Sequence, residues 1–283
     1  MEYENQYQQA LGPKYECLLF DVDDTLYPFG SGLLKNCTKN IEEYMVQKLG
    51  IDEMEVSEMN SAFYKHYGTS MAGLRAFGYD FDYDDYHSFV HGRLPYEVLK
   101  PDHVLRSLLL SLPIRKVIFS NADIVHVNKV LSKLGLNDCF DEIICFETLN
   151  PTKSNVQDQP VLTDTSTIAI YKEGPAVLLP ETPIVCKPFE DAFSQAFKIA
   201  NINPQTTVFF DDSIRNIQSG KRMGLHTVLV GSSQRREGVD CAIESIHNIK
   251  EAIPELCQID DHNKEHDLQM FSRNLGLQTS VTA

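Results

Sequence analysis

Four short polar motifs carry the residue types that could do chemistry, and each of them follows an apolar run. The motifs are Asp21-Val22-Asp23-Asp24-Thr25, Ser120-Asn121, Lys187-Pro188 and Asp211-Asp212. Two carboxylates that are two residues apart point to the same side of an extended segment, so Asp21 could attack an electrophile while Asp23 supplies or removes a proton. A carboxylate nucleophile is typical of phosphoryl transfer, in which an aspartyl-phosphate intermediate divides one difficult displacement into two easier steps.

A divalent cation is the second requirement of this chemistry. Several carboxylates repel a phosphate dianion unless a cation offsets their charge, and Mg²⁺ prefers hard oxygen ligands of this kind. Asp21, Asp211 and Asp212 can supply such oxygens. Lys187 would neutralise the remaining negative charge, and the Ser120 hydroxyl with nearby N–H groups would hold the phosphoryl oxygens.

The apolar runs before the motifs have the length and composition of buried β-strands. They cover residues 17–20, 117–119, 184–185 and 208–210, and a further strand is expected at 227–230. Between the last two motifs, residues 191–200 have helical spacing of apolar side chains. Strands that alternate with helices predict a parallel α/β sheet, in which ligands bind outside the carboxyl ends of the strands. We therefore expect the four motifs to meet at one edge of a sheet.

Composition limits the classes of function. The chain has 283 residues, 42% of them hydrophobic, and a formal net charge of −15. The acidic balance argues against binding of nucleic-acid polymers or anionic membranes. The seven cysteines lack paired metal spacing, and neither a secretory signal nor an apolar stretch near the roughly 20 residues that cross a bilayer is visible. We expect a soluble cytoplasmic protein, with the nucleus left open, and no pattern points to an obligate protein partner.

The pattern changes along the chain in three places. Residues 28–102 have helical periodicity and many tyrosines, which predicts a helical module inserted after the first strand. Residues 147–183 are rich in Pro, Thr, Asp and Gln and predict a long loop inserted in the core. Residues 260–283 are polar and are expected to form a flexible tail. The α/β core is then expected at 14–27 and 103–259.

Each motif taken alone also has a structural explanation. Asp-rich turns are often solvated loops, Ser120-Asn121 could cap a helix, and Lys187-Pro188 could be a surface turn. Asp212 or Ser213 could be the N-cap of the helix that follows. The order of the motifs, each after an apolar run, favours a functional site.

As a set, the motifs resemble the four motifs of the haloacid dehalogenase-like (HAD) hydrolase superfamily. The Asp-x-Asp-x-Thr motif stands at 21–25, the strand ending in Ser or Thr at 117–120, the lysine at 187 and the acidic pair at 211–212. The resemblance implies a Rossmann-like parallel sheet, Asp21 as the nucleophile, and Asp23 as the general acid/base with its backbone carbonyl on Mg²⁺. It also implies Asp212, more than Asp211, as the direct metal ligand. Asp23 favours a phosphatase over a dehalogenase, because family members that cleave carbon–halogen bonds lack this residue and need no Mg²⁺.

The module at 28–102 corresponds in this resemblance to the helical C1 cap of the family, which closes over the site and selects the substrate. Phe63-Tyr-Lys-His-Tyr-Gly68, Gly73-Leu74 and Leu99-Lys-Pro-Asp102, with Tyr27-Pro28, resemble the eukaryotic pyrimidine 5′-nucleotidase branch. This branch implies hydrolysis of UMP- or CMP-like monophosphates. The candidate residues for binding the substrate are Tyr64, His66 and Tyr67 at the base, with cap packing as their competing role, and Thr25, Ser120 and Asn121 at the phosphate.

The sequence therefore predicts a Mg²⁺-dependent phosphomonoesterase, with Asp21, Asp23 and Lys187 as catalytic residues and a pyrimidine nucleoside 5′-monophosphate as substrate. A phosphatase for a sugar or vitamin phosphate, or a phosphomutase, would use the same core. A phospho-acceptor domain of the receiver type or a scaffold without turnover is the alternative outside enzymes. The large insertion after the first strand and the intact set of catalytic positions argue against it.

Overall fold

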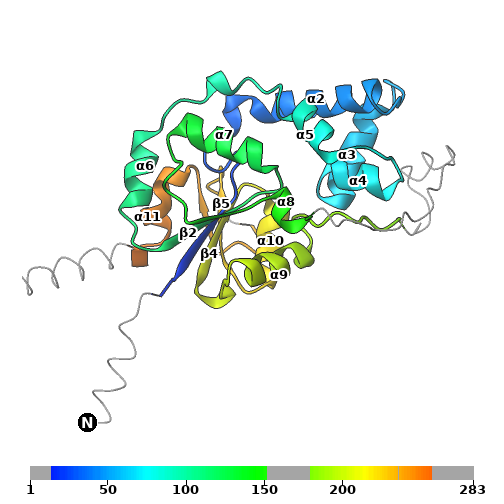
Figure 1. Cartoon of the computed structure of the whole chain (residues 1–283). Coiled ribbons are helices and arrows are strands. Elements are labelled where there is room, and N and C mark those ends of the chain that lie inside the picture. Colours follow the sequence, from blue (N-terminus) through cyan, green and yellow to red (C-terminus); the bar gives the residue numbers. More distant parts are fainter. Residues whose placement is uncertain (1–13, 152–178, 235, 257–283) are drawn as a thin grey trace, which may run out of the picture.

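The fold is a six-stranded parallel sheet between two layers of helices (Figure 1). The computed structural model describes residues 14–151, 179–234 and 236–256. The order of the strands is β3-β2-β1-β4-β5-β6, and every neighbouring pair is parallel, which confirms the predicted α/β class. The strands are β1 (Cys17–Phe20), β2 (Arg115–Phe119), β3 (Glu142–Ile144), β4 (Thr207–Asp211), β5 (His226–Val230) and β6 (Cys241–Ile243).

The two faces of the sheet are covered by different helices. One face of the sheet is covered by α6 (His103–Leu110), α7 (Ile124–Leu134) and α11 (Ile249–Ala252), and the other by α9 (Glu190–Ile199) and α10 (Ile214–Arg222). Side chains alternate between these faces along each strand. In β1, Leu18 and Phe20 join the first core, whereas Cys17 and Leu19 join the second. The apolar runs of the sequence are continuous because both faces of the sheet are buried.

The segment between β1 and β2, residues 28–102, is mainly helical and has its own core. Its aromatic residues pack edge to face, as Tyr44 does against Tyr86, and Phe63 lies buried among them. Phe146, Ile184 and Cys186 from outside the segment belong to the same apolar cluster. The elements of this helical segment are η1 (Phe29–Ser31), α2 (Leu33–Gln47), α3 (Val56–Tyr67), α4 (Ser70–Ala76), α5 (Tyr83–Val90) and η2 (Tyr96–Val98).

Residues 184–185 are not a strand, and this prediction is wrong. Strands β1 and β4 pair directly with each other, so the sheet has no place between them for another strand. The side-chain amide of Asn150 forms the hydrogen bonds to Val185 that the backbone of a neighbouring strand would form in a sheet. Its Oδ1 accepts a hydrogen bond from the Val185 N–H at 2.8 Å, and its Nδ2 donates to the Val185 carbonyl at 3.0 Å.

Other sequence predictions have different outcomes. Strands β3 and β6 were not predicted, because each has three residues with little burial at the sheet edge. The six cysteines among the described residues are all unpaired, as expected, and Cys257 lies outside these residues. Most of the predicted loop insertion, residues 152–178, and the predicted tail lie outside the described residues. A short helix, α8 (Phe146–Leu149), stands where that insertion was expected to begin.

In the described parts of the chain, no helix combines the length and the hydropathy that crossing a bilayer requires.

Substitution of Asn150 tests how residues 184–185 are held in place. In Asn150→Ala, the half-buried N–H and carbonyl of Val185 lose their partners, and we expect the free energy of unfolding to fall by about 1–3 kcal/mol. Urea denaturation measures this change. Asn128→Ala, on the exposed side of α7, is the control and should change stability by less than about 0.5 kcal/mol. Equal effects of the two substitutions would contradict the role of Asn150.

Candidate active site

The predicted motifs meet at the carboxyl ends of β1 and β4. Asp21 directly follows β1, and its N–H donates to the Phe210 carbonyl of β4 at 2.9 Å. Asp211 is the last residue of β4. The chain continues from β1 to one side of the sheet and later returns through β4 on the other side, so the site lies at a topological switch point.

Lys187 connects three strands through one buried ammonium group. Its Nζ lies 2.8 Å from Asp21 Oδ1, 2.8 Å from Asp211 Oδ2 and 2.7 Å from the Phe119 carbonyl. The residue is 1% exposed, and all three N–H bonds of the ammonium have a partner. Burial alone would lower the pKa of Lys187, but Asp21 and Asp211 outweigh it and raise the pKa above its usual value. Lys187 therefore stays charged and holds the two carboxylates together.

Asp21 is a buried carboxylate with protein contacts on both oxygens. The Thr25 hydroxyl donates to its Oδ2 at 3.3 Å, and Lys187 occupies Oδ1. Burial raises the pKa of Asp21, the charge of Lys187 opposes this, and the nearby Asp211 and Asp23 raise it again. The ionised form that a nucleophile needs therefore depends on positive charge close to the site.

Asp21, Asp211 and Asp212 form an acidic group that fits a divalent cation. One ligand atom from each lies within 4.8 Å of the others. Three carboxylates beside a single lysine leave an excess of two negative charges, and hard oxygens suit Mg²⁺. The Asp211 oxygens already accept from Lys187, from Asn216 at 3.0 and 3.1 Å, and from the Ser213 N–H at 2.8 Å. Asp212 is exposed and has the freer oxygens, which favours it as the direct ligand.

Ser120 and Asn121 directly follow β2 at the same edge of the sheet, as predicted, but they differ in what they can contact. The Ser120 oxygen accepts a hydrogen bond from the Ala122 N–H at 3.0 Å, and its O–H has no acceptor among the described residues. The Asn121 amide is fully engaged with the backbone of Lys187, to which it donates at 3.0 Å and from which it accepts at 2.8 Å. Asn121 thus positions Lys187, while Ser120 remains able to donate to a ligand.

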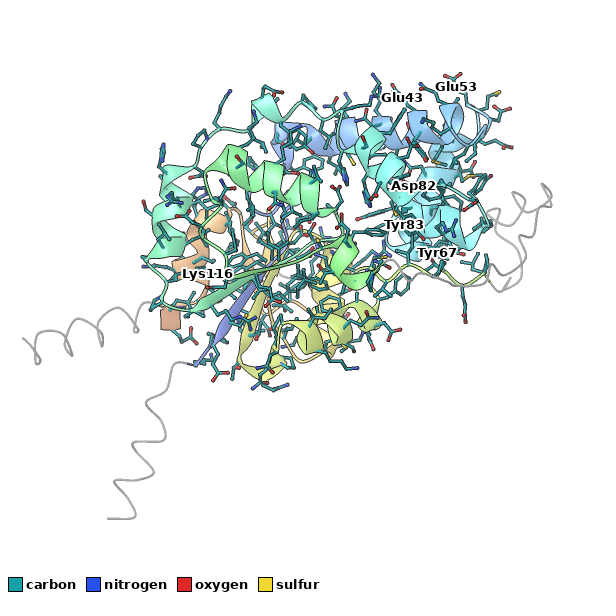
Figure 2. All side chains as sticks on the ribbon, in the orientation of Figure 1. Glu43, Glu53, Tyr67, Asp82, Tyr83 and Lys116 are labelled. Atoms are coloured by element: carbon teal, nitrogen blue, oxygen red, sulfur yellow. The ribbon has the colours of Figure 1, made fainter. Side chains whose placement is uncertain are left out.

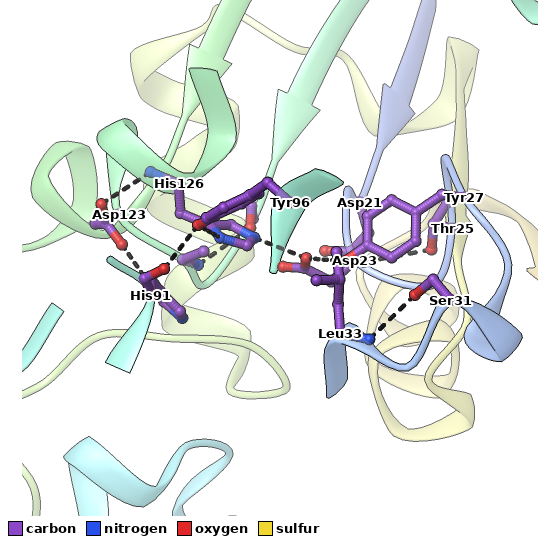
Figure 3. A network of polar contacts seen from close by, with 12 residues as sticks. Asp21, Asp23, Thr25, Tyr27, Ser31, Leu33, His91, Tyr96, Asp123 and His126 are labelled. Atoms are coloured by element: carbon purple, nitrogen blue, oxygen red, sulfur yellow. Dashed lines mark hydrogen bonds and ion pairs between the residues drawn. The ribbon is translucent and has the colours of Figure 1, made fainter. Parts of the chain in front are cut away.

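Asp23 lies in a different environment from Asp21 (Figure 3). Its Oδ1 accepts a hydrogen bond from the Tyr27 hydroxyl and lies 2.8 Å from His126 Nε2. Burial alone would raise the pKa of Asp23, but the charge and hydrogen bond of His126, with that of Tyr27, lower it to about 2. The two carboxylates of the first motif are thus driven in opposite directions by their surroundings.

Further histidines extend from this contact toward the helical segment. His91 Nδ1 is hydrogen-bonded to Asp123 Oδ2, and the Tyr96 hydroxyl lies 2.8 Å from His126 Nδ1. His87 Nδ1 is 3.4 Å from Asp123, and neither ring nitrogen of His87 makes a hydrogen bond within the described residues. No sequence motif predicted this group of histidines. Its only signal was the place of His126 in the first turn of the helix after motif two, which starts at the functional edge of the sheet.

The three candidates for contacting a base occupy different places in the helical segment. The exposed Tyr64 ring lies 5.4 Å from the Arg215 guanidinium, and Arg215 also donates to the Tyr64 carbonyl at 2.9 Å. Burial and the charge of Asp212 raise the pKa of Tyr64. Tyr67 is buried in the segment core and donates to the Pro180 carbonyl at 2.9 Å, so it is a packing residue (Figure 2). His66 is exposed, and no described contact brings it to the site.

Gly68 brings the helical segment into contact with the lysine motif. A Cβ at this position would lie 2.4 Å from the Lys187 carbonyl oxygen and 2.8 Å from the Pro188 ring, and the φ of Gly68 is +82°. Only glycine allows both this backbone conformation and this approach.

No protein-family model matches this chain. It is 25% identical over 226 residues to Phosphate metabolism protein 8 of Saccharomyces cerevisiae. The alignment covers 77% of this chain and 62% of that protein, so the chain spans less than two thirds of the length of this curated relative.

Two solved structures are similar to this chain. CbbY from Rhodobacter sphaeroides, in complex with phosphate, has a TM-score of 0.51 at 16% identity, over 86% of this chain and 99% of that chain. The HAD phosphatase from Thermococcus onnurineus has a TM-score of 0.49 at 16% identity, over 83% and 96%. Identities this low transfer a fold and no activity. Together with the order of the strands, the likeness to CbbY shows that this chain has the same α/β fold as that protein.

Gly68→Ala tests the contact between the helical segment and Lys187. We expect the free energy of unfolding to fall by about 1–2 kcal/mol for the left-handed backbone and by a further ~1–3 kcal/mol for the forced shift of the 187–188 backbone. Gly50→Ala is the matched control, because Gly50 has a φ of +69° but open space around its missing Cβ. Urea denaturation of both variants separates the two costs. Identical losses of unfolding free energy in the two variants would show that the close approach of Gly68 to residues 187–188 does not contribute to stability.

Proposed function

We propose that this chain is a Mg²⁺-dependent phosphomonoesterase that works through an aspartyl-phosphate on Asp21. The observation that carries the proposal is the position of Lys187, whose Nζ lies 2.8 Å from both Asp21 Oδ1 and Asp211 Oδ2. A buried carboxylate beside a lysine and two further acidic residues supplies a nucleophile and a cation-binding group at one place, as phosphoryl transfer requires. We assign the helical segment as a C1-type cap and residues 14–27 with 103–259 as the core.

In the first half-reaction, an Asp21 oxygen forms a bond to phosphorus while the bond from phosphorus to the ester oxygen breaks. Asp23 gives its proton to the departing oxygen, so that an alcohol leaves. The pKa of Asp23 is lowered to about 2 in the free protein, and the negative charge of an incoming phosphate acts to raise it. Lys187 has no free N–H bond, so it holds Asp21 and offsets charge, while the Ser120 O–H donates to a phosphoryl oxygen.

In the second half-reaction, a water molecule attacks phosphorus and Asp23 now removes its proton. The bond between Asp21 and phosphorus breaks, which releases inorganic phosphate and restores the carboxylate. Mg²⁺ held by Asp21, Asp212 and the Asp23 backbone carbonyl would offset the negative charge of the phosphate throughout.

The substrate that we propose is a pyrimidine nucleoside 5′-monophosphate. Support comes from the motifs of the helical segment, which resemble the pyrimidine 5′-nucleotidase branch. The exposed aromatic ring of Tyr64 lies beside Arg215, three residues after Asp212 in the chain, and is suited to stack on a planar base. Tyr67 is excluded from this role by its burial.

Phosphate release by the purified protein tests the function and the substrate. With Mg²⁺ we expect UMP and CMP to be hydrolysed in preference to purine nucleoside, sugar and vitamin monophosphates, and EDTA should abolish the reaction. Asp21→Asn should remove turnover by at least about 10⁴-fold, because an amide cannot serve as the nucleophile. Circular dichroism checks that this variant is folded. Preference for another monophosphate would change the substrate alone, whereas full activity of Asp21→Asn would end the proposed mechanism.

The role of Asp212 can be measured through its effect on Mg²⁺. We expect Asp212→Asn to raise the Mg²⁺ concentration for half-maximal activity by at least about tenfold, because a charged ligand is lost. Asp84→Asn, at an exposed position of the helical segment, should leave this concentration unchanged. Calorimetric titration with Mg²⁺ gives the same comparison without turnover. An unchanged Mg²⁺ requirement in Asp212→Asn would assign the ligand role to another residue.

A further inference from the structure

His126 makes a hydrogen bond on each side of its ring and is 2% exposed. Its Nε2 lies 2.8 Å from Asp23 Oδ1, and its Nδ1 lies 2.8 Å from the Tyr96 hydroxyl (Figure 3). The imidazole therefore stands between the proposed general acid/base and a tyrosine from the helical segment. The catalytic steps proposed above do not use either His126 or Tyr96.

The partners of the Tyr96 hydroxyl define which atoms donate. This hydroxyl has one hydrogen and donates it to the His91 carbonyl at 3.0 Å, because a carbonyl can only accept. Toward His126 it can then only accept, so His126 Nδ1 is a donor. An ionised Asp23 also can only accept, which makes His126 Nε2 a donor as well. His126 is thereby a doubly donating ring that is fixed at both ends.

Both protein hydrogen bonds to the Asp23 carboxylate end on the same oxygen. The Tyr27 hydroxyl and His126 Nε2 each contact Oδ1, and no hydrogen bond from the described residues reaches Oδ2. A carboxylate held through one oxygen by two partners keeps its other oxygen in a defined direction. The Asp23 side chain is 39% exposed, and its Oδ2 has no hydrogen-bond partner among the described residues.

The support for His126 comes from both parts of the molecule. Asp123 is the N-cap of α7, and its Oδ1 accepts the His126 N–H at 3.0 Å. The other oxygen of Asp123 is hydrogen-bonded to His91, which ends α5 of the helical segment. The backbone and the ring of His126 are thus both tied to the helical segment, one through Asp123 and one through Tyr96.

We propose that His126, held by Tyr96, is a positioning residue that fixes Oδ1 of Asp23 and thereby directs Oδ2 to the leaving group. This inference rests on the proposed phosphatase function and adds a residue to its machinery. In the step that it affects, the bond between phosphorus and the ester oxygen breaks, and the proton of Asp23 passes to that oxygen. The geometry matters most for a leaving group that needs this proton, because general acid catalysis contributes most to poor leaving groups.

The experiment compares two leaving groups in a single turnover. Rapid-quench measurement of phosphoenzyme formation is made with UMP, whose alcohol must be protonated to leave, and with p-nitrophenyl phosphate, whose phenolate leaves without help. We expect His126→Ala to slow the reaction with UMP by about 10²-fold and to change the reaction with p-nitrophenyl phosphate far less. His126→Gln should recover part of the UMP rate, because its amide N–H can donate to Asp23. Tyr96→Phe should shift the ratio of rates in the same direction by a smaller factor.

Two matched variants separate positioning from loss of packing. His87→Gln alters a buried histidine of the same group that makes no hydrogen bond to Asp23, and Tyr15→Phe removes a buried hydroxyl without a partner among the described residues. Both should leave the ratio of the two rates unchanged. Equal losses on the two substrates in His126→Ala would overturn the inference and leave the proposed function standing. Should that variant not fold, the ratio in Tyr96→Phe decides. A wild-type protein that releases phosphate from none of the monophosphates named above would end both proposals.

Discussion

The arrangement of the site depends on keeping one lysine charged inside the protein. Lys187 is 1% exposed, and a buried ammonium is tolerated only where hydrogen bonds and opposite charges replace water on every side. Its partners come from the ends of β1, β2 and β4. These three strands are neighbours in the sheet, with β1 in the middle, so a single side chain can reach all of them. The order of the strands is therefore a requirement of the site as well as a property of the fold.

The same constraint explains why two aspartates of one motif differ. Asp21 faces the buried lysine and the acidic pair, where loss of water raises its pKa. Asp23 faces His126 and Tyr27, whose donors stabilise its charged form and lower its pKa to about 2. In the free protein these shifts oppose the roles that we propose, so positive charge at Asp21 and the negative charge of a phosphate at Asp23 would have to reverse them. Only Val22 separates Asp21 from Asp23 in the chain. The two side chains still contact different residues, because the backbone leaves strand β1 at Phe20.

The sequence was sufficient for the features that depend on local patterns. Apolar runs identified four of the six strands, and the motifs at their ends identified Asp21, Lys187 and Asp211 as neighbours. It failed at residues 184–185, since an apolar pair has the same composition whether its backbone pairs with a strand or with the Asn150 side chain. The contacts of His126 could not be derived either, because Tyr96 and Asp23 reach it from positions far apart in the chain.

The helical segment contacts the residues that hold both of the proposed catalytic carboxylates, which would give it a second role besides selecting the substrate. Gly68 packs on the backbone of Lys187, which holds Asp21, and Tyr96 binds His126, which holds Asp23. A segment that only selected a substrate would need neither contact. If the helical segment closes over a ligand as the proposed cap, a ligand that positions the segment poorly would also leave Asp21 and Asp23 poorly placed. Selection of the substrate would then be expressed in the rate of the chemical step as well as in binding.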